Sequence, residues 1–225
     1  MTSEFAQPVR PSHSARALAL LLLLAFNSSA RAEFIRPDSA TASTEFTSGF
    51  DGRAINTING SGLPTSFSPS DAHADYATGN HWVTTGGTPT NEFITWEFST
   101  PENLDTIYLW NHRSTLPTAA NSGYDVVLFD LILRDASNQV LLSLQDVSLA
   151  PDLATAQAIS FGGTISGVSS VRFDIEATQS STTYTGLAEV GFNRAAAVPE
   201  PSTATALAGA AALIWTSLLR RRRAL

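Results

Sequence analysis

Apolar and polar residues alternate one by one through several short segments of this chain. Residues 93–98 read FITWEF and residues 171–177 read VRFDIEA. Such alternation sends successive side chains to opposite faces of a β-strand, which makes one face apolar and the other polar. Antiparallel sheets with one buried and one solvated face carry this pattern. The chain is therefore expected to be all-β, with Ile94, Trp96 and Phe98 on one buried face.

More strand-like segments follow at short spacing, which favours an antiparallel sandwich or barrel. They cover residues 104–110, 124–133, 140–144 and 187–192. In residues 124–133 the apolar parity slips near Asp130, which predicts either a bulge or two short strands. Residues 61–87 are rich in Gly, Ser, Thr, Pro and Asp. A loop of this length predicts either an ordered functional loop or a mobile insertion.

The N-terminal residues 1–32 have the pattern of a secretory signal peptide. Two arginines precede an uninterrupted apolar run, residues 17–26, which is too short to span a bilayer. The small residues Ala30 and Ala32 then form an A-x-A cleavage pattern for signal peptidase. The alternative is a buried helix, which would not require this order of features. The mature chain is expected to begin at Glu33.

The C-terminal residues 196–225 contain three features in a fixed order. Pro199, Glu200 and Pro201 form a rigid, non-helical motif. Residues 204–219 are almost entirely apolar, and residues 220–223 are four arginines. An apolar span followed by clustered arginines predicts a transmembrane helix with its arginines in the cytoplasm. The span is short for a lasting anchor, which favours a temporary membrane hold.

This order of motif, span and arginines resembles the PEP-CTERM sorting signal. The resemblance implies that an exosortase in the inner membrane recognises Pro199, Glu200 and Pro201. It also implies a Gram-negative bacterium that makes exopolysaccharide or biofilm. The exported protein would be held in the inner membrane, cleaved, and passed to the cell surface or extracellular matrix. The alternative is an ordinary tail anchor with a proline-rich hinge.

The segment between the two tags, residues 33–195, is strongly acidic. It holds eighteen of the twenty acidic residues and six of the thirteen basic ones, which gives a formal charge of −12. Such a surface repels nucleic acid, because duplex binding needs lysines and arginines to neutralise phosphates. The chain has no cysteine, so disulfides, thiolate metal sites and cysteine nucleophiles are excluded.

The strand order of this segment resembles the galactose-binding-domain-like family, also called discoidin or F5/8 type C. The segments that carry the resemblance are residues 56–63, 81–82, 94–98, 107–111 and 185–192. The resemblance implies a jelly-roll β-sandwich over residues 33–195. It also implies that ligands, carbohydrate above all, bind on loops at one end of the sandwich.

Many members of that family carry a structural calcium ion. By resemblance, its ligands here would come from Asn59, Gly62, Ala188 and Glu189. The family often has aspartate where this chain has Asn59, so the site has lost a charge and calcium should bind more weakly. The alternative is that Asn59 and Gly60 form a simple turn and that Glu189 is a solvated strand residue. Structural calcium is the one cofactor that the sequence suggests.

A sugar site needs an aromatic face and a few fixed hydrogen-bonding groups. The candidate ligand-binding residues are Trp110, Asn111, His112, Arg113 and Tyr184. Trp110 has the opposite parity to its apolar neighbours in the strand, which predicts an exposed ring. Trp82 and Trp96 are expected in the core instead. The alternative for His112 and Arg113 is a solvated loop with no ligand.

No catalytic motif stands out, and we expect that the chain is not an enzyme. The sequence lacks H-E-x-x-H, G-x-S-x-G and phosphate-binding glycine loops. Carboxylates are abundant, but nothing selects one pair as a glycosidase pair. The expected function is that of an exported surface or matrix protein that binds polysaccharide. The alternatives are a structural biofilm or envelope protein without a small ligand and, less favoured, a hydrolase.

Overall fold

The alternating segments form eight β-strands in this computed structural model, which describes residues 33–87, 89–113, 123–181 and 183–195. The strands are β1 (Glu33–Ile35), β2 (Ser39–Ala42), β3 (Trp82–Val83), β4 (Phe93–Asn111), β5 (Val126–Arg134), β6 (Val140–Ser148), β7 (Gln157–Thr178) and β8 (Gly186–Arg194). The helical element of these residues is a single 3₁₀ turn, η1 (Ala54–Thr57).

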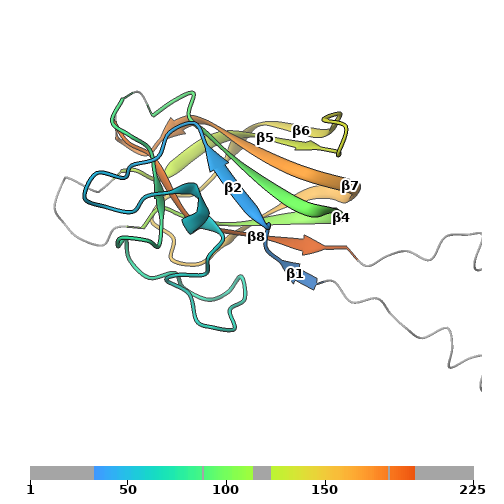
Figure 1. The fold of residues 1–225 in the computed structure, drawn as a ribbon, viewed down its shortest axis with the longest axis horizontal. Coiled ribbons are helices and arrows are strands. Elements are labelled where there is room, and N and C mark those ends of the chain that lie inside the picture. Colours follow the sequence, from blue (N-terminus) through green and yellow to red (C-terminus); the bar gives the residue numbers. More distant parts are fainter. Residues whose placement is uncertain (1–32, 88, 114–122, 182, 196–225) are drawn as a thin grey trace, which may run out of the picture. The chain divides into compact units, whose positions relative to one another are not determined.

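All pairings between these strands are antiparallel, in the order β1-β8-β4-β7-β5-β6, with β2 on β4 and β3 on β8 (Figure 1). The predicted all-β antiparallel class is therefore confirmed. No helix in the described part of the chain is long and apolar enough to cross a membrane. The predicted signal peptide, residues 1–32, and the sorting signal, residues 196–225, lie outside the described residues and stay predictions.

Two long strands, β4 and β7, each pair with different neighbours along their first and second parts. The first part of β4, residues 93–97, pairs with β2 and with the end of β7. The second part, residues 104–111, pairs with the beginning of β7 and with β8. Between the two parts the β4–β7 register shifts. Pro101 lies in this interval, where a residue without an N–H removes no ladder hydrogen bond.

The core lies where these two parts face each other. Ile94, Trp96 and Phe98 are buried as predicted. The Trp96 ring contacts Phe173 of β7 and Phe192 of β8, at centroid distances of 5.9 and 6.3 Å. A strand of one part thus packs against a strand of the other, which gives two layers of sheet.

The predicted irregularity near Asp130 is a bulge inside one strand. The pairing of β5 with β6 shifts register between Phe129 and Leu131. Phe129 and Leu131 are nonetheless both fully buried, and Phe129 stacks on Phe173 at 4.3 Å. The extra residue of this shift lies in β6. The buried side chains of β5 change parity earlier, between Val126 and Phe129, where the β5–β7 register shifts, so that the apolar side chains on both sides of the slip face the core.

Residues 61–87 form an ordered loop in this structure. Their backbone is tied to distant segments by hydrogen bonds from His73 N to Ala154 O (2.8 Å) and from Tyr76 N to Arg113 O (2.7 Å). They also contain β3, which pairs with β8. Of the two sequence-based alternatives, the structure therefore has the ordered loop.

Strand β8 runs between two different ends of the domain. Its first residue, Gly186, pairs with Val83 and receives a bridge from Asp125, and all three adjoin long connecting segments. Its last residue, Arg194, pairs with Glu33 of β1. We call the first end the loop end. It is made by residues 43–87, 89–92, 111–113, 123–125, 149–156, 178–181 and 183–186 (Figure 1).

Candidate functional site

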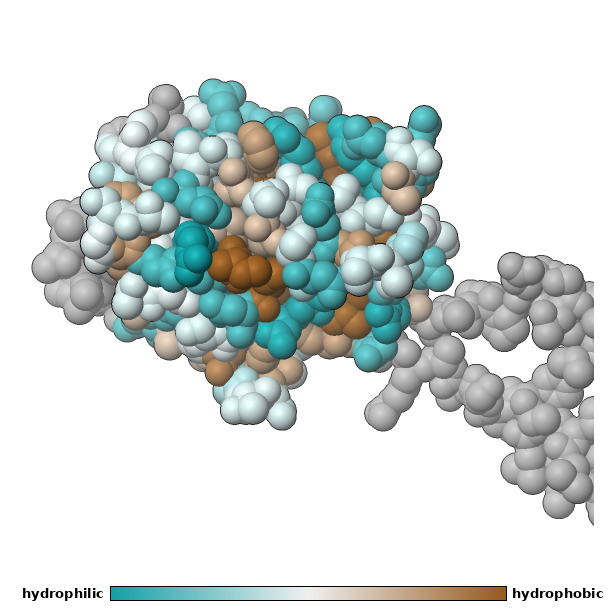
Figure 2. Space-filling model, viewed as in Figure 1, coloured by the Kyte–Doolittle hydropathy of each residue, from teal (hydrophilic) through white to brown (hydrophobic). Residues whose placement is uncertain are grey.

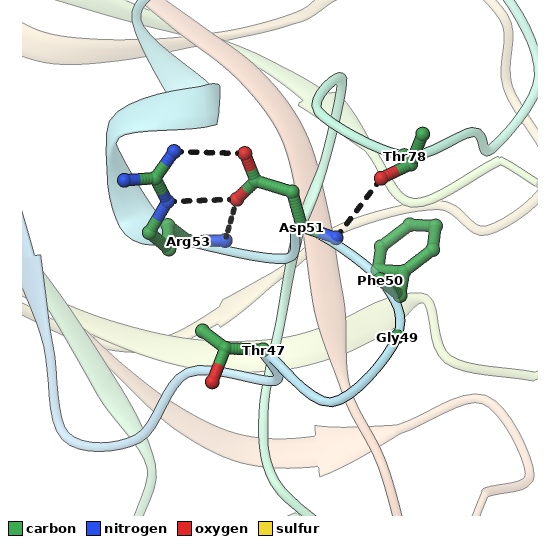
Figure 3. Close-up of a pocket in the computed structure, with 6 residues that line it drawn as sticks. All are labelled: Thr47, Gly49, Phe50, Asp51, Arg53 and Thr78. Carbon is green, nitrogen blue, oxygen red and sulfur yellow. Dashed lines mark hydrogen bonds and ion pairs between the residues drawn. The ribbon is translucent and has the colours of Figure 1, made fainter.

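An open depression of about 500 Å³ lies at the loop end. Its lining residues are Thr47, Gly49, Phe50, Asp51, Arg53 and Thr78 (Figure 3). They combine an aromatic ring, a carboxylate, a guanidinium and two hydroxyls. Such a set of one apolar face and several fixed polar groups can bind a polar ring-shaped ligand.

Asp51 is the polar centre of this depression. Its carboxylate accepts two hydrogen bonds from the Arg53 guanidinium, both 2.8 Å, in a bidentate ion pair. Its backbone N–H donates to Thr78 Oγ1 at 3.0 Å. The hydrogen bonds from Arg53 hold the pKa of Asp51 at about 2. Both charges are therefore fixed in place and largely cancel each other.

Phe50 joins the depression to a cluster of rings beneath it. Its ring stacks on Tyr76 at a centroid distance of 4.6 Å and an interplanar angle of 24°. Tyr76 in turn contacts His81 and His112, at 5.5 and 4.8 Å. Phe46 contacts both Phe50 and Tyr184, at 6.4 and 6.0 Å. The aromatic side of the depression is thus held in place by ring packing.

Three histidines are buried inside the loop end. His73, His81 and His112 are at most 1% exposed. His81 Nδ1 donates to Asn80 Oδ1 (2.6 Å), and its Nε2 accepts from the Arg113 N–H (3.4 Å), which fixes one neutral tautomer. Neither ring nitrogen of His112 has a hydrogen-bond partner among the described residues. Burial lowers the pKa of all three, that of His112 to about 3.

The expectation that Trp110 is exposed is wrong, since its side chain is fully buried. Its indole Nε1 donates to Asp71 O at 2.9 Å, and Phe34 and Phe67 pack against its ring. Asp71 and Phe67 belong to the long loop, which covers the face of β4 that parity alone assigns to solvent. Trp110 therefore supports the loop and presents no ring to a ligand.

The other predicted ligand residues divide into buried and partly exposed ones. Asn111 is buried and bridges to β5, because its amide donates to Val126 O (2.8 Å) and accepts from Val126 N (3.0 Å). His112 is buried as described above. Arg113 forms an ion pair with Asp75 at 3.1 Å, with 27% of its side chain exposed. Tyr184 is half-buried. Only Arg113 and Tyr184 of the five could touch a ligand in this conformation.

The two segments that hold the predicted calcium residues, 59–62 and 188–189, are joined by hydrogen bonds. Gly60 N–H donates to both carboxylate oxygens of Glu189, at 3.2 and 3.1 Å, and Glu189 is fully buried. Burial raises the pKa of Glu189 to about 8, against the opposing effects of the Gly60 N–H and the Arg36 charge. Ala188 is also fully buried. Gly62, with φ of +100°, lies against the His73 ring.

Asn59 lies on the surface of the same turn, with its side chain engaged in local hydrogen bonds. Its Oδ1 accepts from Ser61 N (2.6 Å), and its Nδ2 donates to Gly79 O (3.1 Å). Within the described ranges, no three histidine or acidic side chains gather to hold a metal ion. Calcium at this turn stays a prediction.

Sequence reasoning missed the residues that line the depression. Phe50, Asp51 and Arg53 lie in a stretch without strand alternation, and Thr78 is distant in sequence. The available signal was an aromatic residue and an acid–base pair placed among glycines. A phenylalanine between glycines is unlike a core residue, and it can mark a surface loop.

The face drawn in Figure 2 is mostly hydrophilic or neutral, with hydrophobic residues in small patches between the polar ones. A large contiguous apolar patch would indicate a protein or membrane contact. The described residues show no such patch on this face.

No family model matches the chain, and no curated protein matches it. Solved structures do. A variant of the lectin-binding domain of lectinolysin, complexed with Lewis b, has a TM-score of 0.51 and 21% identity, over 72% of this chain and 95% of that chain. A truncated AlyQ with CBM32 and alginate lyase domains has a TM-score of 0.50 and 14% identity, over 75% of this chain and 34% of that chain.

The F5/8 type C domain of a protein from Bacteroides fragilis is similar too, with a TM-score of 0.48 and 16% identity, over 71% of this chain and 92% of that chain. At such identities the likeness concerns the fold alone. The fold shared with the lectinolysin and AlyQ structures agrees with the galactose-binding-like fold that the sequence resemblance implies.

Proposed function

We propose that this protein is an exported, non-catalytic surface or matrix protein that binds carbohydrate through the depression at its loop end. The observation that carries the proposal is the set of groups around Phe50. A sugar ring presents C–H groups that pack on an aromatic face and hydroxyls that pair with fixed donors and acceptors. Phe50 supplies the aromatic face, and the Asp51–Arg53 pair and Thr78 supply the polar groups.

The fold supports the same proposal by analogy. The lectinolysin domain of similar fold is described as bound to Lewis b, and the AlyQ protein carries a carbohydrate-binding module. Such analogy raises the expectation of carbohydrate binding, but the site has to be argued from its own residues.

Charge favours neutral glycans over acidic ones. Asp51 already neutralises Arg53, so the depression has no free cation for a uronic acid. Residues 33–195 carry a formal charge of −12, with six basic against eighteen acidic residues. A polyanionic polysaccharide would be repelled by this field at low salt. We therefore expect neutral hexose-containing oligosaccharides to bind best.

Replacing Phe50 with alanine is expected to weaken glycan binding about tenfold or more, because stacked aromatic anchors dominate small polar interfaces. The measurement is a glycan array with the purified protein, followed by calorimetric titration of the best neutral oligosaccharide. Arg53→Ala should weaken binding as well, since it removes the guanidinium and leaves the Asp51 carboxylate without its two hydrogen bonds from Arg53.

The matched control is Phe67→Ala. Phe67 is also a half-buried aromatic of the loop end, but it packs on Trp110 and does not line the depression. Equal losses in Phe50→Ala and Phe67→Ala would contradict the proposed site. No retention on any glycan, together with loss of matrix cohesion in a deletion strain, would favour the structural role without a small ligand.

Export and processing form a separate part of the proposal. The supporting features are the signal-peptide pattern that ends at Ala32 and the Pro199-Glu200-Pro201 motif, apolar span and arginine cluster. In this proposal signal peptidase and an exosortase process the chain in turn, and the inner membrane holds it only between these steps. The cell surface or extracellular matrix of a Gram-negative bacterium is the final location.

Substituting alanine for Pro199, Glu200 and Pro201 is expected to leave the protein uncleaved in the inner membrane of an exosortase-containing host. The measurement is fractionation with immunoblotting, in which the wild type should appear shortened and outside the inner membrane. The control is a triple substitution of Ser202, Thr203 and Thr205, which leaves the motif intact. Unchanged release of the motif variant would contradict exosortase processing.

A further inference from the structure

An arginine reaches into the turn where the family resemblance places calcium. The Arg36 guanidinium donates from Nη1 to Ile58 O at 3.1 Å. The same Nη1 lies only 2.8 Å from the position that a Cβ on Gly60 would occupy. On another side, Arg36 Cζ is 5.4 Å from the centre of the Phe67 ring. Arg36 is an exposed residue, and its guanidinium lies against the 58–60 turn.

The turn places that charge close to a buried carboxylate. Gly60, which contacts the Arg36 guanidinium through its α-carbon side, donates its N–H to the Glu189 carboxylate. The Arg36 charge also acts electrostatically on Glu189. A buried carboxylate needs such a partner, because removal from water disfavours its charged form.

The oxygens of this turn already accept hydrogen bonds from the chain itself. Ile58 O accepts from Arg36, Gly60 O from Leu63 N (3.2 Å) and Gly62 O from Ala74 N (2.7 Å). Asn59 Oδ1 accepts from Ser61 N. Calcium needs six to eight oxygens at about 2.3–2.6 Å. An ion at this turn would have to compete with all of these donors and with the arginine.

We propose that the Arg36 guanidinium takes the place of the structural cation in this turn, so that the loop end is ordered without calcium. The neutral Asn59 agrees with this role, since a monovalent guanidinium needs one fewer carboxylate than a divalent ion. Gly60 agrees as well. A side chain there would have to displace the Arg36 guanidinium, and the φ of +72° at Gly60 disfavours most other residues.

The first test is thermal unfolding of the purified protein near pH 8 in EDTA and in millimolar calcium chloride. The two melting curves should coincide. A rise of several degrees with calcium, reversed by EDTA, would overturn the proposal, because the turn would then hold a divalent ion despite Arg36.

The second test replaces Arg36 with methionine, which keeps much of the side-chain length and removes the charge. The melting temperature should fall by several degrees. The matched control is Arg134→Met. Arg134 also donates from Nη1 to a backbone carbonyl, Asn138 O at 3.1 Å, but on an exposed hairpin without a buried carboxylate. Equal effects of the two substitutions would overturn the proposal.

The third test, run above pH 8 so that Glu189 is mostly ionised, shows whether Arg36 acts through Glu189. In a Glu189→Gln background the carboxylate charge is absent, while a side-chain oxygen can still accept from Gly60 N–H. Arg36→Met should then lower the melting temperature by clearly less than it does in the wild type. An undiminished effect would show that Arg36 acts only through its contacts with Ile58 and Phe67, and the proposed cation role would be wrong.

Discussion

Replacing Trp110 with alanine is expected to destabilise the protein by about 3–5 kcal/mol, the usual cost of removing a large buried aromatic side chain. Trp110 is fully buried, and its ring supports Phe34 and Phe67. The substitution also leaves Asp71 O without its indole donor. Urea unfolding followed by circular dichroism measures this change in the free energy of unfolding.

Trp110→Phe serves as the control, because it keeps an aromatic ring while losing the hydrogen bond to Asp71 and part of the buried volume. Its cost should be clearly smaller than that of Trp110→Ala. If Trp110→Ala kept the wild-type stability and lost only glycan binding, Trp110 would be a ligand residue after all, and the covered position of β4 would be wrong.

The second large effect concerns His112 and acid. Its folded-state pKa is about 3, because burial disfavours the imidazolium ion. In the unfolded chain the pKa returns to about 6.5. The unfolded state therefore binds a proton that the folded state refuses, and stability is lost as the pH falls below 6.5 towards the folded value. As the pH falls from about 8 to 5, this one histidine lowers the free energy of unfolding by about 2 kcal/mol.

His112→Leu isolates this effect. Both ring nitrogens lack a partner, so a side chain of similar size without polar atoms should be tolerated near pH 8. We compare the free energy of unfolding of the variant with that of the wild type at each pH. This difference should be about 2 kcal/mol more favourable to the variant near pH 5 than near pH 8. The measurement is urea unfolding of both proteins at the two pH values.

Taking the difference between the two proteins is necessary because other groups titrate in the same range. Burial raises the pKa of Asp125 to about 6 and that of Glu189 to about 8. Each of these acids makes the folded state bind the extra proton, so each lowers stability as the pH rises. These contributions cancel between wild type and His112→Leu. A stability difference independent of pH would contradict a neutral, buried His112.

The core of the fold was predictable because it depends on a local period of two. Ile94, Trp96 and Phe98 alternate with polar residues, and all three are buried. Trp82 and Trp96 were likewise expected in the core and are fully buried there. Alternation cannot predict that a loop packs on the outer face of a strand and buries the side chains there. Trp110 shows this, because the loop that covers it lies some forty residues earlier.

The candidate site was less predictable for the same reason. The Asp51–Thr78 hydrogen bond and the Phe50–Tyr76 stack join segments about 25 residues apart, with no period to relate them. The family resemblance pointed to Asn111 and His112 as ligand residues. In the structure Asn111 forms hydrogen bonds with Val126, and His112 packs against Tyr76, so both are buried inside the loop end. Arg36 belongs to no recognisable sequence motif, and its hydrogen bond to the Ile58 carbonyl is visible only in the structure.

The course of β8 has a mechanical consequence. The strand begins at Gly186, among the loops that carry the depression, and ends at Arg194 beside Glu33. A tether attached after Arg194 and a ligand held at the loop end would therefore pull on opposite ends of one strand. The ladder hydrogen bonds between β8 and β4 lie across that direction, so the load would be shared by many bonds in shear. Such a geometry resists force far better than one in which the bonds open in sequence.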